Sequence, residues 1–224
     1  MFIKFFNWKI SATDENNMFY IFRKMIIEII DKLFQIISGY ILSDIIMGIY
    51  HWIKDTYFTP FTPIIGKTFI WGSRLHHVRP RYVMEFSNID LFYDSAKWTL
   101  SWIAPLFYFF GFNAFLVTMF LTISMNDIVH KYTHFLDHER PLLATILQRV
   151  GIFQSHEEHH VHHISPHEIK YCPITPYTNG PLEAINFWRR MENIIERLTG
   201  VKPRAREIDF TEDENYPAGI KFIE

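Results

Sequence analysis

The sequence predicts an all-α integral membrane protein in which four transmembrane helices form two hairpins and carry a cytosolic, histidine-rich helical cap. Two apolar segments predict the membrane part. Residues 33–53 contain a single formally charged side chain, that of Asp44, and residues 98–126 contain none. Each segment reaches the roughly 20 residues that a helix needs to cross a bilayer core. The cap is predicted from residues 156–168, which hold six of the twelve histidines.

Composition and termini narrow the class of protein further. The formal net charge is −2, so no electrostatic argument supports binding to nucleic acid. Cys172 is the only cysteine, which excludes an intramolecular disulfide. Residues 1–20 lack the apolar core and cleavage site of a signal peptide. We therefore expect an N-terminal arm over 1–20, a membrane domain over 21–205 and a charged C-terminal tail over 206–224.

The first hairpin is predicted over residues 21–56, with a break at Ser38-Gly39. Asp44 lies inside the apolar part, where an ionisable side chain suggests a functional role, or a polar link to another helix. His51 and Asp55 follow, and a spacing of four residues places both on one face of a helix. Either both bind a metal, or Asp55 orients the imidazole of His51.

Residues 59–97 are expected to form a polar loop that contains His76 and His77. Adjacent residues on a helix point about 100° apart. The two histidines could therefore serve two metals, or one could bind a metal while the other packs.

The second hairpin is predicted over residues 98–126, because Gly111 and Asn113 interrupt this uncharged run. One tilted helix, or a buried helix of a soluble protein, is the alternative. The second helix of this hairpin is expected to run from about residue 112 to His134. It ends in His130 and His134, four residues apart, a spacing common in helical metal sites. Asp127 lies one turn before His130 and is a candidate to support it.

In the C-terminal cluster, helical spacing places His159, His162 and His163 on roughly one side. His167 and Glu168 belong to the same stretch, and Glu168 and Asp44 join Asp127 as candidates to support the metal ligands. A solvated polar loop or a flexible metal-sequestering tract is the alternative. Residues 141–155 predict a further apolar helix, either in the membrane interface or in the core, and residues 181–199 predict a helix with an apolar packing stripe.

A shared metal centre requires all these histidines to lie on one side of the membrane. The run 98–126 separates two of the groups, so it must leave and return as a hairpin. Lysine and arginine in the connecting segments place that side in the cytosol. Zinc normally needs four ligands, whereas the candidates here exceed that number and favour two iron ions. We expect no catalytic side chain beyond the metal ligands, which are His51, Asp55, His76, His77, His130, His134, His159, His162, His163 and His167.

Residues 40–205 resemble the Kua-type membrane lipid desaturases, the family of the plasmanylethanolamine desaturases. The resemblance is carried by Asp44-Ile-Ile-Met-Gly-Ile-Tyr-His51-Trp-Ile-Lys-Asp55, His130-Lys-Tyr-Thr-His134 and His159-His-Val-His162-His163-Ile-Ser-Pro-His167-Glu168. It implies that the boxes HxxxH and HxxHH bind metal, and that the remaining candidate ligands match family positions that hold the metals. The sequence departs from the family pattern at Asp127, where we expect Asn, and at Met84-Glu85-Phe86, where we expect a histidine.

The resemblance also implies a reaction. Dioxygen and two electrons from a cytochrome b5-type donor remove two hydrogens from a lipid chain and yield water. We expect an ether phospholipid as substrate and the vinyl ether of a plasmalogen as product, in the membrane of the endoplasmic reticulum with the histidines facing the cytosol. The alternatives are desaturation of a phospholipid acyl chain, a hydroxylase on the same two-iron scaffold, and a zinc-binding or zinc-transporting membrane protein.

Overall fold

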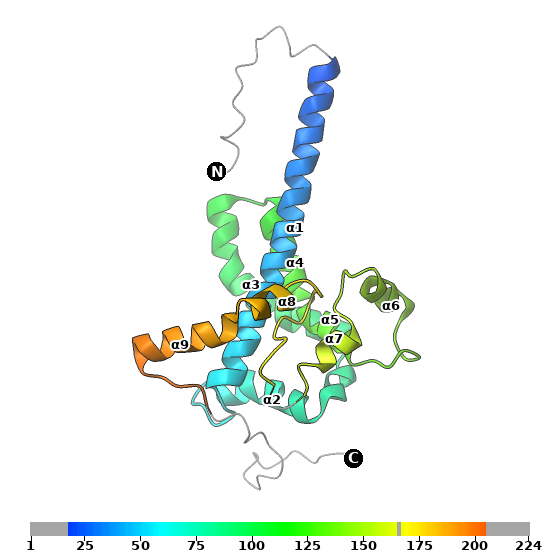
Figure 1. The fold of residues 1–224 in the computed structure, drawn as a ribbon. Helices are drawn as coiled ribbons and strands as arrows, with labels where there is room; N and C mark the ends of the chain where they lie inside the picture. The colour runs from blue at the N-terminus through cyan, green and yellow to red at the C-terminus, as the bar shows by residue number, and fades with distance from the viewer. Residues whose placement is uncertain (1–17, 165–166, 205–224) are drawn as a thin grey trace.

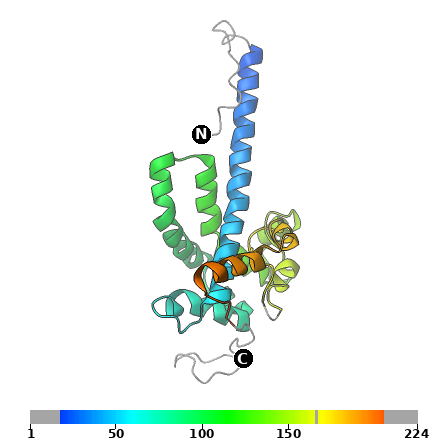
Figure 2. The same ribbon diagram turned by 60° about the vertical axis from the view of Figure 1, so that its left-hand side comes forward.

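The computed structural model describes residues 18–164 and 167–204, and these residues form helices and turns without a β-strand. The longest helix, α1 (Met18–Tyr57), forms a rod beside which the hairpin of α3 and α4 lies (Figures 1 and 2). The short helices gather around its C-terminal end. The predicted tail 206–224 lies outside the described residues, as does the predicted arm up to residue 17. The predicted domain boundaries stay a prediction.

The first predicted hairpin is wrong, because α1 continues through Ser38-Gly39 without a break. The Ser38 hydroxyl donates to the carbonyl of Phe34 at 2.6 Å, one turn back, and so stays inside the helix. Gly39 serves the packing of two helices. A Cβ atom at this position would lie 2.7 Å from the carbonyl oxygen of Phe115 in α4. The glycine therefore allows α4 to approach α1 closely.

The second predicted hairpin is present as α3 (Asn88–Phe110) and α4 (Ala114–Ser124), which excludes a single tilted helix. The chain reverses at Gly111, whose φ of +72° is readily adopted only by glycine. Asn113 caps α4 by accepting a hydrogen bond from the amide of Leu116 at 3.0 Å. Met125 then separates α4 from α5 (Asn126–Thr133), so the expected single helix from 112 to 134 is two helices.

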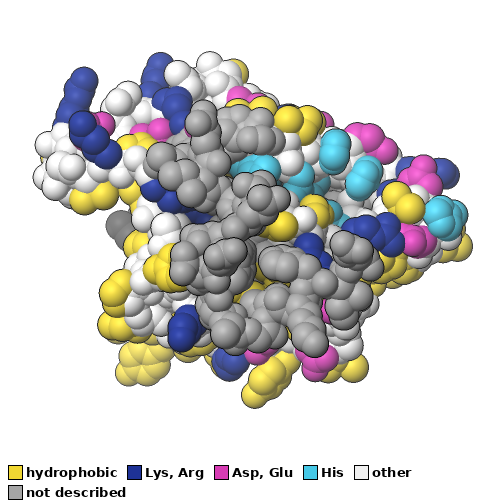
Figure 3. Space-filling view, turned by 90° about the horizontal axis from the view of Figure 1, so that it is seen from below, with side chains coloured by type: hydrophobic (Ala, Val, Ile, Leu, Met, Phe, Trp, Pro, Cys, Tyr) yellow, Lys and Arg dark blue, Asp and Glu magenta, His cyan; other side chains and the backbone are white. Residues whose placement is uncertain are grey.

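Residues 59–97, expected to be a polar loop, are largely helical. A π-helical turn over Gly66–Ile70 leads into α2 (Trp71–Val78), and a 3₁₀ turn over Pro80–Glu85 follows. The remaining helices are α6 (Leu142–Arg149), α7 (His156–His160), α8 (Asn179–Ala184) and α9 (Phe187–Thr199). We call α2, α5 and α7, with the turn after α7, the cap; Figure 3 shows histidine side chains reaching its surface.

Two small cores hold α1 in place. Ile46 of α1 packs against Ile103 of α3 and against Leu116 and Met119 of α4. Farther along α1, Trp52 packs against Tyr171, Cys172 and Trp188. The N-terminal half of α1 packs against neither core and exposes large apolar side chains such as that of Phe34, which is 69% exposed. Within the described part of the chain, α1 alone is both long and apolar enough to cross a membrane.

Helix α6 exposes large apolar side chains and buries a polar one, the reverse of a helix in a soluble protein. Its apolar side chains Leu142, Leu143 and Ile146 are exposed, whereas Gln148 is buried and donates to the carbonyl of Tyr132 at 3.3 Å. Of the two expected positions for this segment, the exposure of these three side chains favours the membrane interface, although Ala144 is buried. The Tyr40 hydroxyl donates to the carbonyl of Ile152 and ties the end of this segment to α1.

Candidate metal centre

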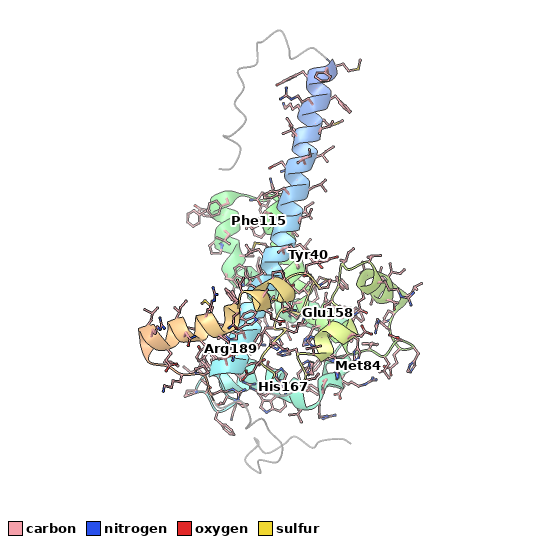
Figure 4. The ribbon with its side chains drawn as sticks, in the orientation of Figure 1. Tyr40, Met84, Phe115, Glu158, His167 and Arg189 are labelled. Atoms are coloured by element: carbon pink, nitrogen blue, oxygen red, sulfur yellow. The ribbon has the colours of Figure 1, made fainter. Side chains whose placement is uncertain are left out.

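The structure brings nine of the ten predicted ligands together in two adjacent groups. In each group, potential ligand atoms lie within 4.8 Å of one another. The first group is His76, His130, His134, His159 and His163, and the second is His51, Asp55, His77 and His162. His167, which is labelled in Figure 4, belongs to neither group, but its ring centroid lies 4.6 Å from that of His77 of the second group.

Four segments far apart in sequence supply these side chains. Helix α1 carries His51 and Asp55, α2 carries His76 and His77, and α5 with the residue after it carries His130 and His134. Helix α7 and the turn after it carry the rest. Both pairs of adjacent histidines divide between the groups, as the 100° step of a helix predicts for His76 and His77.

In the first group the imidazole nitrogens converge. The Nε2 atom of His159 lies 2.8 Å from that of His130 and 3.0 Å from that of His163. The Nε2 atom of His163 lies 3.1 Å from that of His76. Nitrogen lone pairs gathered this closely repel one another unless a cation or shared protons lie among them. The donor set therefore fits a metal ion.

The second group also gathers lone pairs, and here hydrogen bonds show which ring nitrogen of two histidines carries the proton. Nδ1 of His51 lies 3.1 Å from the carbonyl oxygen of Tyr171, and Nδ1 of His162 lies 2.8 Å from that of Ile169. A carbonyl only accepts, so each Nδ1 carries the proton and each Nε2 presents a lone pair. These Nε2 atoms lie 3.3 and 3.5 Å from Oδ2 of Asp55. Three acceptors that face one another repel unless a cation or a shared proton lies between them, so this group also fits a metal ion.

Burial keeps the cap histidines in the form that binds metal. Burial lowers the pKa of several of them well below the ordinary 6.5, and neighbouring imidazoles lower it further. This applies to His76, His130, His159 and His163. Burial also lowers the pKa of His134 to about 3. These imidazoles are therefore neutral at physiological pH, so a metal ion displaces no proton from their ligating nitrogens.

Arg74 is a part of the site that the sequence did not reveal. Its side chain is 1% exposed, and its Nη2 atom donates to the carbonyls of Lys54, Asp55 and Phe58 at 2.8–3.1 Å. Its Nη1 atom lies 3.6 Å from Oδ1 of Asp55. Arg74 thus fixes both the end of α1 and the Asp55 carboxylate. A lone arginine between Ser73 and Leu75 gave no sequence signal for this role.

The three predicted supporting residues have other partners. Asp44 accepts hydrogen bonds from the amides of Ile174 and Thr175 at 2.8 and 3.1 Å, and so holds the segment after the histidine cluster against α1. Asp127 accepts from Ser95 at 2.6 Å. Glu168 pairs with Arg189 at 3.2 Å. The expected support of the metal ligands is therefore not seen for Asp44, whose place in the structure is that of a polar link.

A cavity of about 710 Å³ adjoins both groups. His51 of the second group and His76 and His130 of the first lie in its wall. Most other wall residues are apolar or aromatic, and the volume is typical of a small-molecule site. Phe86, from the stretch where the family pattern suggested a histidine, also lines the cavity. Neither ligand group draws a residue from 84–86.

An all-helical protein with two histidine groups beside an apolar cavity has the features of a metal-dependent enzyme that acts on lipids. The comparisons with known proteins agree. The lipid desaturase domain matches residues 40–206, and the chain belongs to this family.

Proteins of similar sequence are also named as desaturases. A "probable fatty acid desaturase" of Acanthamoeba polyphaga mimivirus is 72% identical over 200 residues, which are 89% of this chain and 100% of that protein. Plasmanylethanolamine desaturase 1 of Mus musculus is 32% identical over 79% of this chain and 69% of its own length. The chloroplastic fatty acid desaturase 4-like 2 of Arabidopsis thaliana is 29% identical over 75% of this chain and 61% of its own length. No solved structure matches. Desaturases are oxidoreductases, and so is this enzyme.

Proposed function

We propose that this enzyme is an O2-dependent lipid desaturase that holds two iron ions and forms the vinyl ether double bond of plasmalogens. The observation that carries the proposal is the pair of adjacent ligand groups on one apolar cavity. One group offers five imidazoles, and the other offers three imidazoles and a carboxylate. Nine side chains exceed the four that complete a structural zinc site. Iron accepts mixed imidazole and carboxylate ligands.

In this proposal the protein holds the metal ligands in a fixed geometry and keeps water out of the cavity. When bound, the iron supplies the redox chemistry that activates dioxygen. Tyr171 and Ile169 orient His51 and His162 through their carbonyls, and Arg74 holds Asp55 in position. The apolar wall places a lipid chain against His51, His76 and His130. In this proposal no side chain outside the ligand set acts as acid or base, and a cytochrome b5-type protein supplies the electrons.

The choice of an ether lipid is supported by the mouse relative, whose name specifies a plasmanylethanolamine substrate. Desaturation of an acyl chain is the second candidate, because other relatives are named fatty acid desaturases. The two candidates share the site and differ only in the lipid that the cavity accepts.

Expression of this chain in cells that make plasmanyl lipids but lack their own desaturase is expected to restore vinyl ether phospholipids. Lipid mass spectrometry with acid hydrolysis measures them, because acid cleaves vinyl ethers and spares alkyl ethers. A new acyl double bond without vinyl ethers would instead establish the second candidate. Oxygen retained in the lipid would indicate a hydroxylase.

We further propose that α1 crosses the membrane of the endoplasmic reticulum and that the hairpin of α3 and α4 enters it from the side of the cap, which faces the cytosol. The exposed apolar side chains of α1 support this arrangement, and those of α6 support a position for that helix in the membrane interface. Because α1 is one helix, its N-terminal end then lies opposite the cap. This replaces the predicted pair of hairpins.

A cysteine placed at Met18 is therefore expected to react with a membrane-impermeant thiol reagent only after sealed microsomes are permeabilised. A cysteine placed at Lys202 should react directly. The native Cys172 is fully buried, so the introduced thiol dominates the labelling. Reaction of both cysteines in sealed microsomes would contradict the single crossing.

A further inference from the structure

One wall of the cavity is formed by α1, and its side chains change from apolar to charged along the helix. Ile46 and Met47 come first, Tyr50 and His51 follow, and Lys54 comes last. These residues cover about 12 Å of helix at 1.5 Å per residue. Ile46 also packs on the core of the α3–α4 hairpin, so the apolar end of the wall lies toward the hairpin. The wall thus runs from an apolar end, past a candidate metal ligand, to a cation.

The Lys54 ammonium stands out among the charged groups of this cavity. It lies 4.4 Å from the centroid of the Tyr50 ring, and no described residue offers it a hydrogen bond or an ion pair. The two carboxylates of the wall are already engaged. Asp94 pairs with Lys97 at 2.9 Å, and Asp127 accepts hydrogen bonds from Ser95 and Asn126 at 2.6 and 2.9 Å. Burial disfavours the Lys54 ammonium, and the carboxylates of Asp55 and Asp127 offset this only in part from beyond ion-pair distance, so an anion in direct contact is the expected partner.

We propose that Lys54 binds the phosphate of the lipid substrate and sets how far the lipid chain enters the cavity. The proposal rests on the proposed function, since it takes the cavity to be the lipid site. The tail then lies along Ile46 and Met47, and the polar end lies at Lys54. Lys54 follows His51 by three residues, a rise of about 4.5 Å. The carbons beside the metal ligands are consequently those nearest the head group, and the double bond forms at the polar end of the chain.

Lipid binding tests this without turnover. The metal-loaded protein, kept without a reductant, is titrated in neutral detergent with an ether phospholipid and with the matching alkylglycerol, which lacks the phosphate. We expect the wild type to prefer the phospholipid by about 10–100-fold, the range of a hydrogen bond to a charged group. Lys54→Met should remove the preference, and Lys54→Arg should keep most of it. Lys202→Met should leave it unchanged, because this lysine is exposed and both it and its partner Glu196 lie outside the cavity wall.

Three results would overturn the proposal. One is an unchanged preference in Lys54→Met. Another is an equal loss of both lipids in Lys54→Met and Lys54→Gln at normal metal content and melting temperature, because that marks a packing role. A third is competition by soluble glycerol phosphate as strong as that of the phospholipid, because the ligand would then be a free phosphate. The proposed function fails separately, if the reduced wild type converts neither ether nor acyl lipids while its head-group preference persists.

Discussion

The substitutions His130→Ala and His163→Ala are each expected to abolish product formation and to lower the bound iron from two ions per chain to one or fewer. Both imidazoles lie within about 3 Å of other nitrogens of the first group, His130 facing His159 and His163 facing both His76 and His159. Loss of even a residue that only supports a ligand typically costs about 10–100-fold in metal affinity or activity. We expect a greater loss for a ligand itself. Elemental analysis of purified protein and lipid mass spectrometry measure the two effects.

The matched control is His160→Ala. His160 lies in the same short helix as His159, but its side chain is exposed, and its ring stacks on His156 rather than entering either group. We expect wild-type iron content and wild-type product from this variant. Turnover retained in both His130→Ala and His163→Ala would remove these residues from the proposed ligand set.

Asp55→Asn is expected to disable the second group and to destabilise the protein. The carboxylate lies 3.3–3.6 Å from the Nε2 atoms of His51, His77 and His162, and an amide removes the only anion among them. It also removes an ion-pair partner of the buried Arg74. Breaking a buried ion pair by removing one partner costs about 3–5 kcal/mol. The three carbonyls that Arg74 retains favour the lower end of that range.

Iron content near one ion per chain, absent product and a lower melting temperature are the expected measurements for Asp55→Asn. Glu196→Gln is the control, because this carboxylate is 41% exposed and pairs with Lys202, which is 76% exposed, at 3.7 Å. Exposed pairs of this kind contribute little to stability. An Asp55→Asn protein with two bound irons and normal turnover would show that the carboxylate is not a ligand.

The grouping of the candidate ligands could be predicted from sequence in part, because several of them follow helical periodicity. His130 and His134 are four residues apart, and the 100° step between neighbours explains how His76 and His77 divide between the groups. The need for a return through residues 98–126 likewise predicted the turn at Gly111. Local spacing was sufficient in each case, because the relevant side chains lie within one or two turns of each other.

Features that depend on contacts between distant segments could not be predicted in this way. A Ser-Gly pair is compatible with a break or with close packing, and only the approach of Phe115 shows which applies at Gly39. Asp44 looked like a support for the metal ligands, but its partners lie some 130 residues along the chain at Ile174 and Thr175. Arg74 is similar, since its role depends on α2 lying against the end of α1.

In the proposed topology, the unbroken α1 couples the candidate metal centre to the thickness of the host bilayer. A helix whose apolar length exceeds the hydrocarbon thickness tilts to compensate, and a thicker bilayer straightens it. His51 and Asp55 lie on α1, whereas His77 and His162 lie on segments of the cap. Because Trp52 and Arg74 hold the C-terminal end of α1 against the neighbouring segments, a change of tilt would turn the whole candidate metal centre relative to the membrane surface. The same enzyme would therefore behave differently in membranes that are rich in sterols and in membranes that are poor in them.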